Sequence, residues 1–277
     1  MVIHSPGPNW KPGVDFREQP GGMMVAVDTV TRDELEEFAA KEVTSVPESP
    51  NPEDIFLEIG KKKVFAGAVY WPGWCRQGKD EATALKALFA AAPRYQQVLQ
   101  TMQLDFDLPE KVTAFTVGER VQGNTTTDFG APDALLSGDE DPVEENELQR
   151  FGTILQASWY AFDEAVRMAE GQELRKGPRG GGRDLQKMIQ HVVGSEEAYL
   201  QRLGWKMEKA AREIQERMLR TREGVLKGLE AAARGDLSKR GPRGGKRWTA
   251  RFFVRRVTWH VLDHAWEIED RMTSNGV

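Results

Sequence analysis

Two histidines near the end of the chain have a spacing that could hold a metal ion. His260 and His264 stand four residues apart in the sequence Trp-His-Val-Leu-Asp-His. On a helix, this spacing places two side chains on one face, about one turn apart. A third histidine, His191, lies in an earlier segment that also has helical periodicity. Three imidazoles from two packed helices would form a metal site with open coordination positions.

The histidine pair falls on the apolar face of its predicted helix, which also carries Phe253 and Val257. Because a buried polar group without a partner is costly, both imidazoles need partners there. His191 falls on the flank of the apolar stripe of its own segment, a position that can face a neighbouring helix in a bundle. Three separate hydrogen-bonded histidines are the alternative, since no glutamate stands between the pair as it does in HExxH metalloproteases.

Length and composition favour a globular chain of up to two domains. The 277 residues are 39% hydrophobic and 29% charged, with a net charge of −5. The single cysteine, Cys75, excludes a disulfide within the chain and fits a reducing compartment. No run approaches the roughly 18 apolar residues of a membrane span, and the first residues do not resemble a secretory signal. We therefore expect a cytoplasmic protein that does not bind membranes.

The periodicity along the chain predicts an α+β fold in three parts. Residues 1–50 are expected to be an arm with a short helix at 31–41. Residues 51–135 are expected to form a small α+β domain, and residues 144–277 a four-helix bundle. The predicted strands are 55–59, 64–70 and 113–121, and the predicted helices after the arm are 80–91, 144–169, 183–203, 205–233 and 248–272.

Charge is unevenly distributed along the chain. Residues 133–147 carry seven acids and no base, whereas residues 239–256 carry eight bases and no acid. We do not expect the basic segment to bind nucleic acid, because the net charge is negative and the segment lacks a stacking motif. Its arginines Arg251, Arg255 and Arg256 are interpreted as a solvated helix face. The alternative is that one of them binds the carboxylate of a substrate or cofactor.

The three histidines also lie in two passages that resemble a known family. The passages are residues 184–197, DLQKMIQHVVGSEE, and residues 255–268, RRVTWHVLDHAWEI. Around them, residues 147–272 resemble the DinB-like superfamily, which includes YfiT-like proteins and mycothiol-dependent maleylpyruvate isomerases. The resemblance implies a four-helix bundle and a metal triad of His191, His260 and His264.

The same resemblance implies a cofactor and a kind of chemistry. Family members are associated with zinc, nickel or other divalent ions, and characterised relatives activate low-molecular-weight thiols. A metal with open positions can lower the pKa of a bound water or thiol. We therefore expect a metal-dependent thiol S-transferase, or a related hydrolase, that acts on a small-molecule substrate. The alternative is a non-catalytic metal or small-molecule binding protein.

Several side chains could orient an imidazole or bind substrate beside the histidines. The candidates for these roles are Glu196, Arg255, Arg256 and Trp259. Asp263 and Glu267 lie off the histidine stripe and are interpreted as solvated or paired with Arg256 or Arg271. The alternative is that one of them orients an imidazole N–H.

Residues 54–98 resemble a second family. Pro72, Gly73 and Gly78 form a P-G-x-x-x-x-G turn before an acidic, alanine-rich helix, and this is similar to the strand–turn–helix of HicB-like domains. HicB domains are best known as antitoxins, so a HicB-type regulatory module with a degenerate bundle is a further alternative for the function, but no DNA-binding segment follows this one. We interpret it as a scaffold that packs on the bundle, where it would cover the metal pocket or build the interface of a homodimer.

Overall fold

The computed structural model describes residues 15–18, 24–27, 51–176, 182–207, 212–242 and 244–272. The chain divides into two compact units, Met1–Glu48 and Ser49–Val277. In the first unit, β1 (Asp15–Glu18) pairs antiparallel with β2 (Met24–Val27). The short helix predicted at 31–41 lies outside the described residues.

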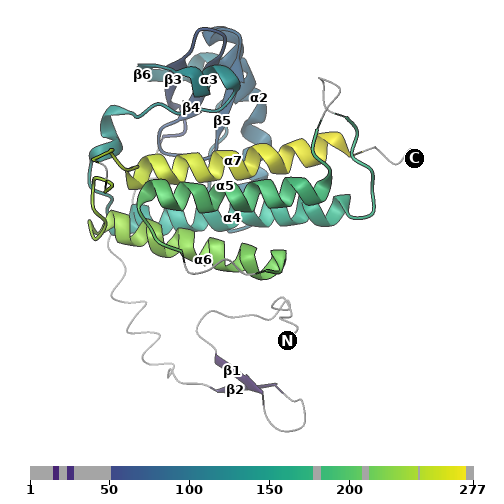
Figure 1. The fold of residues 1–277 in the computed structure, drawn as a ribbon. Helices are drawn as coiled ribbons and strands as arrows, with labels where there is room; N and C mark the ends of the chain where they lie inside the picture. Colours follow the sequence, from purple (N-terminus) through teal and green to yellow (C-terminus); the bar gives the residue numbers. More distant parts are fainter. Residues whose placement is uncertain are drawn as a thin grey trace, which may run out of the picture. The chain divides into compact units, whose positions relative to one another are not determined.

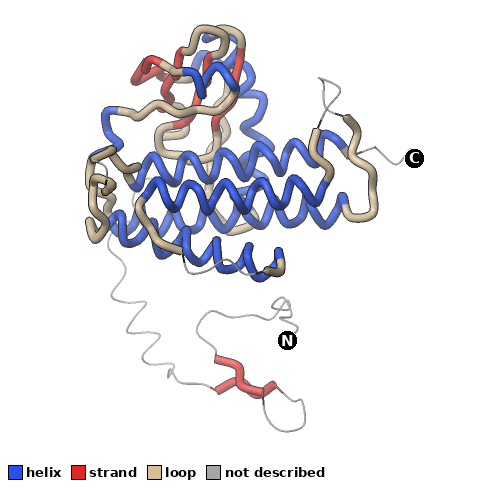
Figure 2. The backbone as a smooth tube through the Cα atoms, viewed as in Figure 1, coloured by secondary structure: helices blue, strands red, loops and turns tan. Residues whose placement is uncertain are grey.

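The second unit begins with a small sheet and continues with long helices, which confirms the α+β class (Figures 1 and 2). Its strands are β3 (Asp54–Ile59), β4 (Val64–Ala68), β5 (Cys75–Gly78) and β6 (Thr116–Gln122). Its α-helices are α2 (Glu81–Gln100), α3 (Thr125–Phe129), α4 (Glu145–Ala169), α5 (Leu185–Leu203), α6 (Ile214–Ala233) and α7 (Ala250–Arg271). Two 3₁₀ turns, Val112–Ala114 and Ser137–Glu140, complete it. Among the described residues, no helix is both long and apolar enough to cross a membrane.

The sheet has the strand order β5-β4-β3-β6. β3 pairs antiparallel with β4 and parallel with β6, which forms one edge. β5 was not predicted, because its four residues, Cys-Arg-Gln-Gly, include none of the branched or aromatic types typical of strands. Pairing with β4 places it in the sheet despite this composition.

Helix α2 starts where the sequence predicts and ends later. Asp80 caps it by accepting a hydrogen bond from the Thr83 backbone N–H at 2.8 Å. The prediction ended the helix at residue 91, but it continues through Pro93 to Gln100. Proline removes one hydrogen bond of the helix. The turns that follow are fixed by buried side chains such as Tyr95, whose hydroxyl donates to the Pro72 carbonyl at 2.8 Å.

The four predicted bundle helices are all present, with one different boundary. The third was predicted to begin at residue 205, but α6 begins at Ile214. Gly204 ends α5 in a left-handed conformation, with φ of +101°. The Trp205 backbone N–H then donates back to the Leu200 carbonyl at 2.9 Å, so the chain turns away before the next helix starts.

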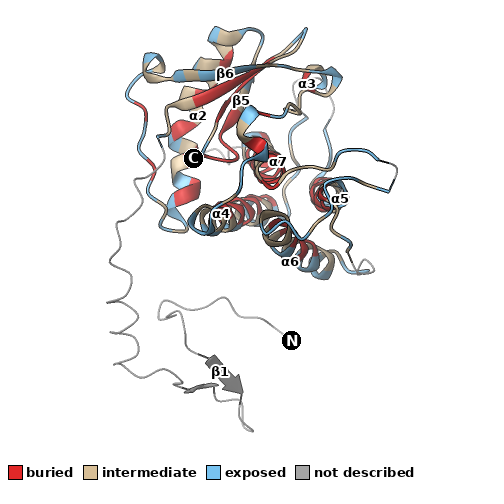
Figure 3. Cartoon of the chain, turned by 90° about the vertical axis from the view of Figure 1, so that its left-hand side faces the viewer, coloured by how far each residue is buried: buried red, intermediate tan, exposed pale blue. Residues whose placement is uncertain are grey.

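Helix α7 lies between the sheet and the other helices, and 16 of its 22 residues are buried (Figure 3). A helix buried on all sides belongs to the core rather than to a surface face. The turn before β5 approaches it closely at Gly73, which has φ of +94°. A Cβ atom there would lie 2.9 Å from a Leu262 methyl and 3.2 Å from Thr258. The sheet and the bundle therefore pack as one compact unit, Ser49–Val277.

The acidic segment 133–147 and the basic segment 239–256 pair with each other. Ion pairs join Asp139 to Arg255, Glu140 to Lys246 and Glu147 to Arg251. The Arg255 and Arg251 side chains are only 12% and 19% exposed. The interpretation of these arginines as a solvated face is therefore wrong, because the acidic segment crosses the start of α7 and covers them.

Candidate metal centre

Helices α5 and α7 bring the three predicted histidines together. His191 comes from α5, and His260 and His264 come from successive turns of α7. One ring nitrogen from each lies within 4.8 Å of the other two. The Nε2 atoms of His260 and His191 are 3.2 Å apart. Two nitrogens bound to one ion at metal–ligand distances of about 2.0–2.1 Å lie about 3.0–3.4 Å apart, so small ring rotations would complete such a site.

Burial keeps two of these imidazoles, those of His191 and His260, neutral. His260 is 6% exposed and His264 8%, while His191 is half-buried. Desolvation, and then repulsion from His264, lowers the pKa of His191 to about 4. Desolvation also holds the pKa of His260 well below its usual value. A neutral imidazole offers the lone pair that a metal ligand requires, whereas a protonated one does not.

A carboxylate fixes the orientation of His264. Its Nδ1 lies 3.0 Å from Glu267 Oε2, and Arg271 holds the other oxygen of this carboxylate at 2.8 Å. When Nδ1–H donates to Glu267, the lone pair lies on Nε2, which faces the other histidines. The predicted pairing of Glu267 with Arg271 is confirmed. Its contact with His264 was the alternative interpretation, and the signal for it is the i, i+3 spacing on one helix.

Glu196 is buried, but it points away from the histidines. It accepts a hydrogen bond of 2.6 Å from Trp159 Nε1 on α4, and its second oxygen has no partner among the described residues. Burial, the largest effect, raises its pKa to about 7. Glu196 follows His191 by five residues, so the two side chains leave α5 on different faces.

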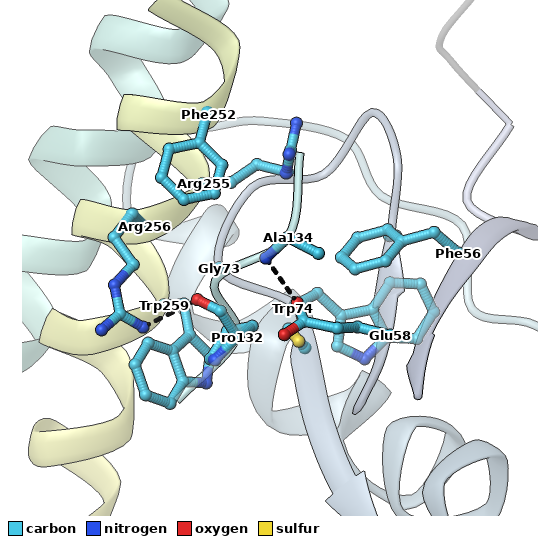
Figure 4. A pocket seen from close by; sticks show the side chains of 12 residues that line it. Phe56, Glu58, Gly73, Trp74, Pro132, Ala134, Phe252, Arg255, Arg256 and Trp259 are labelled. Carbon is cyan, nitrogen blue, oxygen red and sulfur yellow. Dashed lines mark hydrogen bonds between the residues drawn. The ribbon is translucent and has the colours of Figure 1, made fainter. Parts of the chain in front are cut away.

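Arg255, Arg256 and Trp259 line a cavity of about 20 Å³ between α7 and the sheet (Figure 4). This volume holds about one water molecule and is too small for a substrate. Trp259 packs edge-on against Phe65 of β4, with ring centroids 6.1 Å apart. The two arginines point in different directions, Arg255 to Asp139 and Arg256 to the Pro132 carbonyl at 2.9 Å.

Tyr199 is a neighbour of the histidines that was not predicted as a site residue. Its ring meets that of His260 edge-on, with centroids 5.6 Å apart. Its spacing from His191 could have indicated this contact, because the two residues are two i, i+4 steps apart on α5 and therefore share a face.

Comparison with known proteins supports the DinB-like character of the helical part. Residues 154–268 match the family model described as the DinB superfamily, and this range contains all three histidines. The curated proteins and the solved structures contain no match to the chain.

Proposed function

We propose that His191, His260 and His264 bind a divalent metal ion. The observation that carries the proposal is the close grouping of three ring nitrogens, one from each histidine, within 4.8 Å in a largely buried site. Glu267 supports it, because a carboxylate bonded to the outer nitrogen of an imidazole is the usual partner of a metal-binding histidine. Three nitrogen ligands suit zinc and nickel among other divalent ions.

The proposed activity is that of a metal-dependent thiol S-transferase acting on a small molecule. A bound ion with open positions supplies a Lewis acid that favours the thiolate form of a thiol at neutral pH. Burial lowers the pKa of His191 and His260 and so keeps these two ligands neutral, and Glu267 orients His264. The match to the DinB superfamily is consistent with this proposal. In it, the HicB-like part serves as the scaffold that packs against α7.

We expect one equivalent of metal in the wild-type protein and none in the His260→Ala/His264→Ala double variant. Two of the three ligands are lost in the variant, and a single imidazole does not retain an ion during purification. The measurement is mass-spectrometric metal content on protein purified without a metal-binding tag. Glu164→Gln, on α4, where the exposed carboxylate pairs with Arg167, is the control. An empty wild-type protein, even after incubation with zinc, nickel, manganese and iron, would make the histidines structural.

Metal-loaded protein is expected to consume a low-molecular-weight thiol together with an electrophile, and the double variant is not. The electrophile is 1-chloro-2,4-dinitrobenzene, in which the thiolate displaces chloride. The reaction is followed by the absorbance of the thioether product. Turnover that depends on metal supports an S-transferase. Full metal occupancy without turnover for a panel of thiols and electrophiles would instead support the non-catalytic metal-binding alternative.

A further inference from the structure

Arg256 is a buried cation without a carboxylate partner. The described chain has two arginines in its buried class, Arg256 at 9% exposure and Arg271 at 7%. Arg271 pairs with Glu267, but no described carboxylate lies within ion-pair distance of Arg256. A buried charge without a counterion is costly, and burial in proteins normally comes with pairing.

The contacts that Arg256 does make leave part of its hydrogen-bonding capacity free. One terminal nitrogen donates to the Pro132 carbonyl at 2.9 Å, while Nε is buried and has no partner in the described chain. The guanidinium lies 4.9 Å from the ring of Trp259 and 5.4 Å from that of Tyr199. These aromatic faces attract the cation but provide no negative charge.

The carboxylates around Arg256 have other partners. Glu58, which lines the same small cavity, accepts from the backbone N–H groups of Asp133 and Ala134 at 2.9 and 3.0 Å. Asp133 and Glu196 are the acids that act electrostatically on Tyr199, beside Arg256. Asp133 accepts from the Asn124 amide at 3.0 Å, and Glu196 accepts from Trp159. The neighbouring arginine, Arg255, already has Asp139. The missing counterion of Arg256 is therefore not another part of the described chain.

Arg256 extends the row of histidines along α7. Arg256, His260 and His264 follow one another at i, i+4 spacing, so they lie on one side of the helix, with about 6 Å of rise at each step. Tyr199 bridges the same interval on α5, because its ring contacts both His260 and Arg256. The face of α7 that carries the proposed metal ligands thus also carries an unpaired cation, about one helical turn away.

We propose that Arg256 and Tyr199 bind the carboxylate of a small-molecule ligand whose other end reaches the metal site. The inference rests on the proposed metal site and specifies the class of its ligand. Nε–H of Arg256 and O–H of Tyr199 are two donors for a planar carboxylate. Tyr199 does not line the 20 Å³ cavity beside Trp259, so this position is distinct from that cavity. The ligand carries its metal-binding atom two or three carbon atoms from this carboxylate, which matches about one helical turn.

Two thiols of equal length test the proposal, 3-mercaptopropionate and the uncharged 3-mercaptopropanol. Their affinities for cobalt-loaded protein are measured from the thiolate-to-cobalt absorption band. Wild type is expected to bind the carboxylate about 10- to 100-fold more tightly, as a charge-assisted hydrogen bond allows. Arg256→Gln should remove this preference and leave mercaptopropanol binding unchanged, while Arg256→Lys should keep part of it. Equal affinities in the wild type would overturn the proposal.

Two further measurements separate failure of this inference from failure of the metal site. Arg222→Gln removes another arginine of low exposure, one paired with Asp163 across α4 and α6, and should keep the full preference for the carboxylate. In metal-free protein, propionate should shift the nuclear magnetic resonance signal of Arg256 Nε–H. That shift without cobalt binding would reject the metal site and retain the anion site. No shift, together with equal thiol affinities, would reject the anion site alone.

Discussion

Replacing Asp139 by asparagine should destabilise the folded protein by about 3–5 kcal/mol. Asp139 is 3% exposed, and both of its oxygens accept hydrogen bonds from the Arg255 guanidinium. One of them also accepts from the Leu136 backbone N–H at 2.7 Å. The neutral amide would leave Arg255 buried without a counterion, and this costs more than the pair itself contributes. Urea unfolding at neutral pH measures the difference in unfolding free energy.

Two controls distinguish this effect from a general loss of negative charge. Glu140→Gln, on the same segment, breaks an ion pair with Lys246 whose side chains are more than half exposed and screened by water, so it should destabilise the protein far less than Asp139→Asn. Adding Arg255→Gln to Asp139→Asn should recover part of the loss, because the second change removes the unpaired cation. A loss below about 1 kcal/mol for Asp139→Asn would show that the pair does not hold the segment to α7.

Replacing Glu196 by glutamine should stabilise the protein at and above neutral pH. Burial raises the folded-state pKa of Glu196 from its usual 4.5 to about 7. Between these values the folded state binds a proton that the unfolded state has lost, so wild-type stability falls as pH rises through this window. Glutamine does not titrate and can still accept from Trp159. The stability of the variant relative to wild type should therefore rise by about 3 kcal/mol between pH 4.5 and pH 7.5.

The groups around Glu196 are consistent with this sign. Desolvation is the largest effect and raises its pKa. Asp163 of α4 and the adjacent Glu197 also raise it. Arg222 of α6 and the hydrogen bond from Trp159 of α4 lower it, but by less. Glu164→Gln on α4 is the control. The exposed carboxylate of Glu164 accepts a hydrogen bond from Arg167, which lowers its pKa, so the shift has the opposite direction to that of Glu196. Denaturant midpoints of the three proteins across the pH range give the comparison. A parallel course for wild type and Glu196→Gln would mean that folding does not raise the pKa of Glu196.

Local patterns predicted most of the fold. Long helices with a strong apolar period, such as α4 and α7, were predicted to within one or two residues at each end. The errors occurred where tertiary contacts override local preference. β5 has no strand composition and exists because β4 pairs with it. Helix α2 passes Pro93 because Tyr95 and its neighbours are buried in the next turns.

The candidate site was predictable to the extent that it depends on spacing within one helix. The pair His260 and His264 follows from the i, i+4 rule. His191 was added from its place on the flank of its own predicted helix, and the family resemblance supported it. Side-chain direction between helices was not predictable in the same way. Glu196 and Arg255 were candidates for the site by sequence. In the structure Glu196 contacts Trp159, and Arg255 contacts Asp139. Arg255 and Arg256 are adjacent in sequence, but they lie on different sides of α7, and Arg256 is the one that shares the side of the histidines.

The central position of α7 has a consequence for the order of events during synthesis. The sheet and helices α4 to α6 leave the ribosome before α7, yet each packs part of its apolar surface on that last helix. Domains fold as units while the chain is made, and exposed apolar surface in the interval favours aggregation. Truncation before Ala250 should therefore yield an aggregating chain rather than a smaller stable protein. Folding of the sheet and the bundle would be completed in a single late step.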